Sequence, residues 1–345
     1  MNEVETGSAA AIARDPSAVP AGVIETIKRM RRPIMISHVV PDADALGSMF
    51  AMARAWTEPN RQPIAALPDG SVSKRLAFMP EWAEIPIATD ADFESADGFV
   101  VLDTAKAARC GVGKERKTGD WIAGRPVVNI DHHATNTGFG TVNWVVGEAG
   151  STCELVYHML ASARRTIDAV TASMLFAGMQ TDTLGFSLPS TSASALHVAG
   201  ELVALGAAVG ELGERLCRSQ RKSEFDLLRV IFANTRIVAD GAIAYSTATH
   251  DEIHGAGCSA ADIDDQINVP RSLEGARIAM LFTEGNRGKT RINFRGSGSV
   301  TVLELAAHFG GGGHQQSAGA ILDCPPDEAV ARVVPYAVEY LARSQ

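Results

Sequence analysis

Short apolar runs alternate with helical segments through the first half of the chain. The helical segments carry apolar residues three or four positions apart, as Val23, Ile27 and Met30 do, and this spacing indicates one buried face. The apolar runs have the length and composition of strands that are buried on both faces, as in a doubly wound parallel sheet. The predicted strands are residues 34–36, 64–67, 98–102 and 127–130.

The second half of the chain changes from helices to strands. Ser151 and Glu154 have the spacing of a capping box, so we expect a helix to begin there and to end near Ser162. Further helices are predicted at residues 167–180, 191–205, 209–217 and 223–237. Later strands are predicted at 242–248, 277–282, 291–294 and 319–322, with helices at 302–308 and 327–341.

A length of 345 residues suggests about two domains. The pattern predicts an α/β fold in which the doubly wound domain is joined by helices to a smaller α/β domain. The predicted divisions are a flexible tail at residues 1–19, the first domain at 20–190, a helical connection at 191–239 and the second domain at 240–345.

The composition narrows the class of protein. Hydrophobic residues make up 46% of the chain, and no apolar run approaches the roughly 18 to 20 residues of a membrane span. The N-terminus has no secretory pattern and the five cysteines show no CxxC spacing, so we expect a reduced, cytoplasmic protein. The net charge of −9 argues against a protein that coats long nucleic acid. It allows a small phosphate-bearing substrate, because bound cations can reverse the local field.

Polar residues able to bind metal follow the predicted elements. His38, Asp103 and Asp131 each come after an apolar run, and in a parallel sheet the ends of these strands share one edge. We therefore expect them to converge on one site. The full set of residues assigned to element ends is His38, Asp42, Asp44, Asp103, Asp131, His132, His133 and Asp182.

Five carboxylates in one site would repel one another strongly unless cations balanced them. Oxygen ligands with a few imidazoles favour Mn²⁺ or Mg²⁺ over a structural zinc, and two such ions that share a carboxylate could clamp a phosphoryl group. Taken singly, Asp42 and Asp44 could be helix N-caps, His38 a buried histidine, and Asp103 and Asp182 cap or turn residues. Their joint occurrence favours a metal site.

Four motifs resemble the DHH phosphoesterases, which are named for the triplet Asp131-His132-His133. The other three are residues 38–48, where Ala43 replaces a usual glycine, residues 103–105 and residues 181–183. The resemblance implies that His38, Asp42 and Asp103 bind one metal, and that Asp44, Asp103, His132 and Asp182 bind a second, with Asp103 bridging. From the ligand types we expect Mn²⁺ ahead of Mg²⁺. The resemblance implies a contact from His133 to the scissile phosphate and an orienting role for Asp131 beside a histidine.

Residues 310–319 resemble the GGGH motif of the DHHA1 domain, in which backbone N–H groups approach an anionic oxygen. The resemblance implies substrate binding by Gly311, Gly312, Gly313, His314 and Arg295, and an active site in the cleft between the domains. A flexible glycine loop is the alternative for the glycine run alone.

The nearest resemblance is to the group of bifunctional oligoribonucleases and 3′-phosphoadenosine-5′-phosphate phosphatases. It implies hydrolysis of RNA or DNA oligonucleotides of about two to five nucleotides, including linear dinucleotides, and of adenosine 3′,5′-bisphosphate. Because no apolar run is long enough for a membrane span, we expect no membrane partner. Members of the family that the chain resembles often dimerise, which allows a homodimer. The alternatives are an inorganic pyrophosphatase or short-chain polyphosphatase with the same metal chemistry, and a non-catalytic nucleotide- or RNA-binding module.

Overall fold

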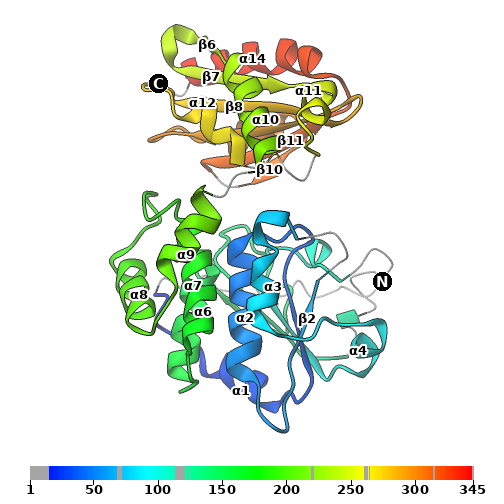
Figure 1. Ribbon diagram of the computed structural model, residues 1–345, viewed down its shortest axis with the longest axis vertical. Helices are drawn as coiled ribbons and strands as arrows, with labels where there is room; N and C mark the ends of the chain where they lie inside the picture. The colour runs from blue at the N-terminus through cyan, green and yellow to red at the C-terminus, as the bar shows by residue number, and fades with distance from the viewer. Residues whose placement is uncertain are drawn as a thin grey trace, which may run out of the picture. The chain divides into compact units, whose positions relative to one another are not determined.

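The computed structural model describes residues 15–67, 72–112, 121–122, 124–218, 221–259, 263, 265–313 and 315–343. Most of the predicted tail and His314 therefore lie outside the described residues. The chain forms two compact units, Met1–Ser219 and Gln220–Gln345. Figure 1 shows both units and labels many of their elements.

Unit 1 contains the predicted parallel sheet. Its five strands lie in the order β2-β1-β3-β4-β5, and every neighbouring pair is parallel. The order reverses between β1 and β3, which makes the ends of these two strands the switch point where ligands bind in such sheets. The strands are β1 (Pro33–Ile36), β2 (Ile64–Ala66), β3 (Gly98–Leu102), β4 (Val127–Asp131) and β5 (Val142–Val145).

Helices cover both faces of this sheet, and β3 shows why its sequence is apolar throughout. Val100 and Leu102 face the larger core, while Phe99 and Val101 face a second core on the other side. The helices are α1 (Ala21–Arg29), α2 (Ala43–Trp56), α3 (Phe78–Ala83), α4 (Asp90–Ser95), α6 (Thr152–Ser162), α7 (Ala169–Asp182), α8 (Ala193–Ala204) and α9 (Val209–Gly213), which continues into a π-helical turn (Glu214–Arg218).

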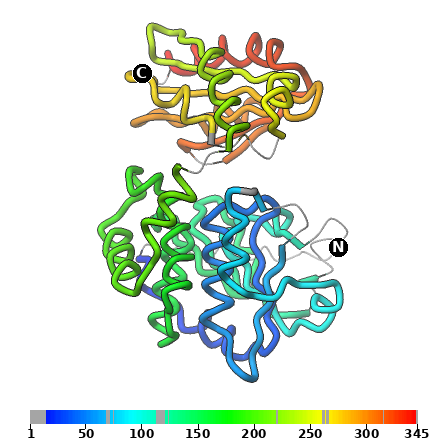
Figure 2. The backbone as a smooth tube through the Cα atoms, viewed as in Figure 1, coloured from blue at the N-terminus to red at the C-terminus, as the bar shows by residue number. Residues whose placement is uncertain are grey.

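Helix α2 is buried on nearly all sides. It packs against α6 and α7, and its backbone can be followed in Figure 2. Two glycines permit this close packing. A Cβ on Gly47 would lie 2.4 Å from the carbonyl oxygen of Met174, and one on Gly178 would lie 2.4 Å from Cys153 Sγ. The N-terminal end of α2 is thereby fixed beside the ends of the strands.

Unit 2 contains a six-stranded mixed sheet in the order β10-β11-β9-β8-β7-β6, in which β7 and β8 are parallel. Alternate residues of β8 enter two cores, Met280 and Phe282 on one face and Leu281 on the other. The strands are β6 (Arg236–Val238), β7 (Ile243–Ala248), β8 (Ile278–Asn286), β9 (Lys289–Gly296), β10 (Gly312–Gly313) and β11 (Ser317–Leu322). The helices are α10 (Lys222–Ala233), α11 (His250–Gly255), α12 (Asn268–Arg271), α13 (Leu303–His308) and α14 (Pro326–Arg343).

The segment predicted as a helical connection is shared between the units. Leu202 of α8 and Leu212 of α9 belong to the core of unit 1, whereas Leu227 of α10 packs in unit 2. The helix predicted at 223–237 ends at Ala233, because the residues that follow pair with β7 as strand β6.

Among the described helices, none is by itself both long and apolar enough to cross a membrane. One pair, Ala193–Ala204 with Val209–Arg218, reaches that length and composition together, but the two helices are bent by 119°.

Candidate active site

The ends of β1, β3 and β4 bring the predicted site residues to one edge of the sheet. His38 lies two residues beyond β1, Asp103 directly follows β3, and Asp131 is the last residue of β4. Asp103 has φ +53°, in the left-handed region that a non-glycine residue rarely occupies. Its N–H donates to the carbonyl of Ile130 at 3.0 Å, which holds this turn in place. Such strain costs about 1–3 kcal/mol and is typical of functional sites.

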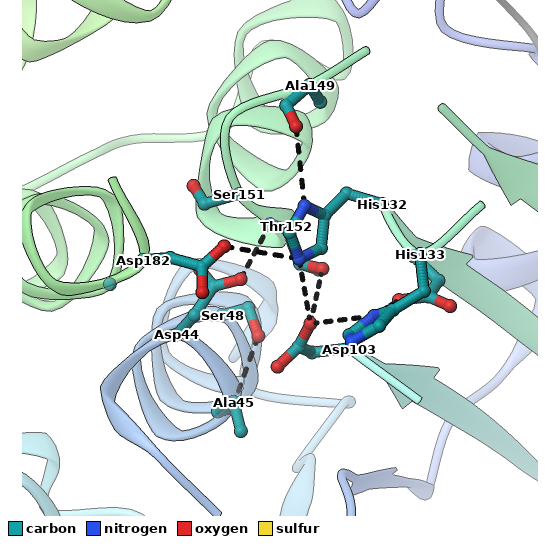
Figure 3. A network of polar contacts seen from close by, with 12 residues as sticks. Asp44, Ala45, Ser48, Asp103, His132, His133, Ala149, Ser151, Thr152 and Asp182 are labelled. Atoms are coloured by element: carbon teal, nitrogen blue, oxygen red, sulfur yellow. Dashed lines mark hydrogen bonds and ion pairs between the residues drawn. The ribbon is translucent and has the colours of Figure 1, made fainter. Parts of the chain in front are cut away.

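Asp103 lies at the centre of the cluster (Figure 3). Its Oδ2 is 3.6 Å from His38 Nε2, and its Oδ1 is 3.6 Å from both His132 Nε2 and His133 Nδ1. Three groups of side chains have ligand atoms within 4.8 Å of one another, a spacing that suits a shared metal ion. These groups are His38, Asp42 and Asp103; Asp44, His132 and Asp182; and Asp103, His132 and His133.

Asp42 divides its two carboxylate oxygens between the helix and the site. As the N-cap of α2, its Oδ1 accepts from the N–H groups of Asp44 at 3.1 Å and Ala45 at 3.0 Å. Its Oδ2 lies 3.9 Å from His38 Nε2. The capping and ligand interpretations of Asp42 are therefore compatible.

Asp44 is almost completely buried and faces the N-terminus of α6. Its two oxygens accept from the backbone N–H groups of Thr152 at 2.7 Å and Cys153 at 2.9 Å, where the positive end of the helix favours an anion. The hydroxyl of Thr152 also donates to Asp103 Oδ1 at 3.0 Å. Thr152 was not among the predicted site residues. Ser151 caps this helix by accepting from the N–H of Glu154, but that local signal does not reveal the distant partners of Thr152.

Asp182 is the last residue of α7, the helix predicted at residues 167–180, so it reaches the site from a helix end and not from a strand end. A carboxylate is disfavoured at the C-terminus of a helix, because the last carbonyl groups carry partial negative charge. Its Oδ2 lies 3.3 Å from His132 Nε2. His132 Nδ1 lies 3.3 Å from the carbonyl oxygen of Ala149, which fixes the imidazole with Nε2 toward the acids.

Asp131 contacts a histidine and takes no part in the three groups. It is fully buried, and its Oδ1 lies 2.7 Å from His133 Nδ1. Its Oδ2 accepts from the side-chain amide of Asn136 at 2.6 Å. Asn136 is a second residue that the sequence prediction missed.

Burial and mutual repulsion shift the pKa values of the aspartates in the site. Burial, and then the charges of Asp103 and Asp182, raise the pKa of Asp44 well above its usual range. Burial also raises the pKa of Asp182, to about 6. Burial opposes ionisation of Asp103, but its contact with His38 and the charge of His133 outweigh that effect and lower its pKa. The site thus stabilises one carboxylate strongly at the expense of its neighbours.

The pKa of each of the three histidines in the site is raised, because the neighbouring carboxylates outweigh the effect of burial. Burial opposes protonation of His132, but the carboxylates of Asp182 and Asp103 outweigh it and raise its pKa to about 10. The extra proton on this imidazole balances part of the negative charge of the neighbouring aspartates. Divalent cations would balance the same charge. Carboxylate oxygens and imidazole nitrogens are also suitable ligands for such cations. The residues present therefore fit a divalent metal centre.

In unit 2, the sheet brings Arg295 near the glycine run. Arg295 on β9 is paired with Ser317 on β11, and the next residue of β11, Ala318, is paired with Gly313. The flexible-loop alternative does not hold for Gly312 and Gly313, because they form strand β10. A Cβ on Gly311 would lie 2.1 Å from the carbonyl oxygen of Gly319, so close backbone packing explains that glycine.

Residues 33–179 match the DHH family, N-terminal domain, and residues 240–342 match the DHHA1 domain. With the acid and imidazole cluster, these matches define a metal-dependent phosphoesterase, a hydrolase that uses divalent metals. The chain carries the two domains in this order and belongs to the DHH/DHHA1 family.

Several relatives are similar over most of their length. The chain is 29% identical over 330 residues to the bifunctional oligoribonuclease and PAP phosphatase NrnA of Thermus thermophilus, covering 93% of this chain and 94% of the relative. It is 27% identical over 305 residues to the protein of the same name from Bacillus subtilis, covering 86% and 91%. The solved structure of an exopolyphosphatase-related protein from Bacteroides fragilis has the same fold, with a TM-score of 0.83, 23% identity and coverage of 93% and 97%.

Proposed function

We propose that this protein hydrolyses short oligonucleotides of about two to five nucleotides, including linear dinucleotides, and the 3′-phosphate of adenosine 3′,5′-bisphosphate. The observation that carries the proposal is the position of Asp103, whose two oxygens face histidines of different groups. A carboxylate placed in this way can be shared by two cations. The similarity to relatives named bifunctional oligoribonuclease and PAP phosphatase supports the substrate class.

Two divalent cations, Mn²⁺ ahead of Mg²⁺, would be held by the sheet-edge residues. When bound, they supply positive charge that polarises a phosphoryl group and makes water easier to deprotonate. His38, Asp42 and Asp103 would hold one cation, and the second would be held by Asp44, Asp103, His132 and Asp182.

The remaining residues of the site would position these groups and the substrate. With His133 Nδ1 engaged by Asp131, the contact with the scissile phosphate falls to Nε2. Thr152 fixes the orientation of Asp44 and Asp103 through its N–H and its hydroxyl. Because Asp44 and Asp103 are both almost completely buried, water competes little for their ligand atoms.

In unit 2, Arg295 and the glycine run would bind a part of the substrate other than the scissile phosphate. The planar guanidinium group suits a phosphate, and closely spaced backbone N–H groups at residues 311–313 can add further donors. His314, which lies outside the described residues, would belong to the same site. We assign substrate binding to residues 240–345 and catalysis to residues 20–190.

A substrate panel with Mn²⁺ tests the proposal. It includes a labelled dinucleotide, a five-nucleotide RNA, an RNA of about 24 nucleotides, adenosine 3′,5′-bisphosphate and pyrophosphate. We expect turnover of the two short RNAs and the bisphosphate, slow turnover of the long RNA, and none by the Asp103→Asn variant. Faster hydrolysis of pyrophosphate than of every nucleotide would favour the pyrophosphatase alternative. Binding without turnover, by protein shown to hold Mn²⁺, would favour a non-catalytic module.

A further inference from the structure

The side-chain amide of Asn136 connects three parts of the active site. Its Nδ2 lies 2.6 Å from Asp131 Oδ2, 2.8 Å from Asn129 Oδ1 and 3.3 Å from the carbonyl oxygen of Thr104. Its Oδ1 accepts from the N–H of Gly138 at 2.7 Å. An amide nitrogen has two protons, so the two short contacts are the main hydrogen bonds.

The surrounding contacts determine which way this amide points. Asn129 is fully buried, and its Nδ2 donates to the carbonyl oxygens of Val101 at 3.3 Å and Thr104 at 3.2 Å. Its Oδ1 is therefore the atom that faces Asn136 and must accept. A carboxylate oxygen also needs a donor, so the NH₂ group of Asn136 is directed at Asp131.

This orientation governs the other oxygen of Asp131. Because Asn136 donates to Oδ2, Oδ1 is left to accept from His133 Nδ1, which lies 2.7 Å away. A proton held on Nδ1 fixes the tautomer of the imidazole and the plane of its ring. The same amide reaches the carbonyl group of Thr104, the residue that follows the left-handed turn at Asp103.

We propose that Asn136 is a positioning residue, which acts through Asp131 to hold His133 in the Nδ1-protonated tautomer and ties that histidine to the Asp103 turn. The inference rests on the proposed contact between His133 and the scissile phosphate. Loss of the amide leaves Asp131 buried with one oxygen unpaired, so the carboxylate and the imidazole can rotate. The metal ligands keep their own contacts.

A double-mutant cycle separates this role from a merely structural one. Asn136→Ala is expected to lower kcat about 10- to 100-fold, the range typical of residues that orient catalytic groups, with KM changed less than about threefold. In a His133→Ala background the same substitution should change kcat less than about threefold, because its target is gone. Thr137→Val is the matched control. The exposed hydroxyl of Thr137 donates to the carbonyl oxygen of Ala105, 3.2 Å away, and not to Asp131 or His133, so the kcat of this variant should stay near wild type.

The substrate for the cycle is the panel member that the wild-type protein turns over fastest, so an error in the assigned substrate leaves the test intact. Equal losses in both backgrounds, or a wild-type kcat for Asn136→Ala, would overturn the inference. Asn136→Asp, which keeps the shape but removes the donor, replaces Asn136→Ala if that variant does not fold.

A measurement independent of activity is the ¹⁵N spectrum of the histidines in Mg²⁺-loaded protein. The His133 signals should report a single Nδ1-protonated tautomer in the wild type and a mixture in the Asn136 variants. An unchanged tautomer in a folded Asn136 variant would contradict the proposal even if the protein hydrolysed none of the nucleotides.

Discussion

The backbone N–H of Thr152 donates a 2.7 Å hydrogen bond to Asp44 Oδ2, so the first turn of α6 holds the one carboxylate of α2. The hydroxyl of the same threonine donates to Asp103 Oδ1 at 3.0 Å. A residue far from both aspartates in the sequence therefore fixes two of the acids that would share the cations.

Thr152→Val keeps the size of the side chain and the backbone N–H but removes the hydroxyl donor to Asp103. We expect Mn²⁺ affinity and kcat to fall about tenfold, at the low end of the range for residues that orient metal ligands. Thr152→Ser retains the hydroxyl and serves as the control, with both values near wild type. Equal Mn²⁺ titrations for the valine and serine variants would show that the hydroxyl does not matter.

Metal binding should depend on pH because cations must displace protons from the site. His132, with a pKa raised to about 10, carries a proton at pH 7 in the metal-free protein, and Asp182, with a pKa of about 6, gains one below that pH. Release of at least one proton predicts that affinity rises about tenfold or more for each pH unit from about 6.5 to 8.5. Calorimetry in two buffers of different ionisation enthalpy measures the protons released. An affinity that is constant over this range would contradict the assigned protonation.

Arg295→Ala should impair substrate binding without removing metal. Since Arg295 lies in unit 2, outside the three metal-competent groups, we expect KM for the short substrates to rise about tenfold while the Mn²⁺ content stays unchanged. Arg287→Ala is the control, because that exposed arginine pairs with Asp251 in the same unit. Loss of Mn²⁺ from the Arg295 variant, measured by elemental analysis, would refute the prediction that Arg295 binds substrate and not metal.

The strand ends could be predicted from the sequence because an apolar run followed by a polar residue is a local pattern. This pattern located His38 and Asp103, and the structure brings both to one cluster. Thr152 and Asn136 could not be predicted, since their partners depend on how distant segments pack. The helix end at Asp182 could also be predicted, but the contact of Asp182 with His132 depends on how α7 packs against α2.

The sequence pattern did not predict strands β5 and β10, because neither contains a local apolar run. Strand β5 has Asn143 in its centre and lies at the edge of its sheet, so it lacks the continuous apolar run of β3. Strand β10 consists of two glycines, which have low strand propensity and pair only because β11 lies beside them.

Gly178→Ala tests the close packing that holds Asp44. A Cβ there would lie 2.4 Å from Cys153 Sγ and 2.7 Å from Asp44 Oδ1, so we expect the free energy of unfolding to fall by about 1–3 kcal/mol and Mn²⁺ affinity to fall with it.

Gly200→Ala is the matched control. That glycine is also inside a helix, but no atom lies within 4 Å of its added Cβ, so the substitution should stabilise the protein by about 0.4–1 kcal/mol. All four tryptophans lie in unit 1, so urea unfolding followed by tryptophan fluorescence reports on the unit that contains both glycines. Equal effects of the two substitutions would show that contact at Gly178 does not limit the packing of α7 against α2.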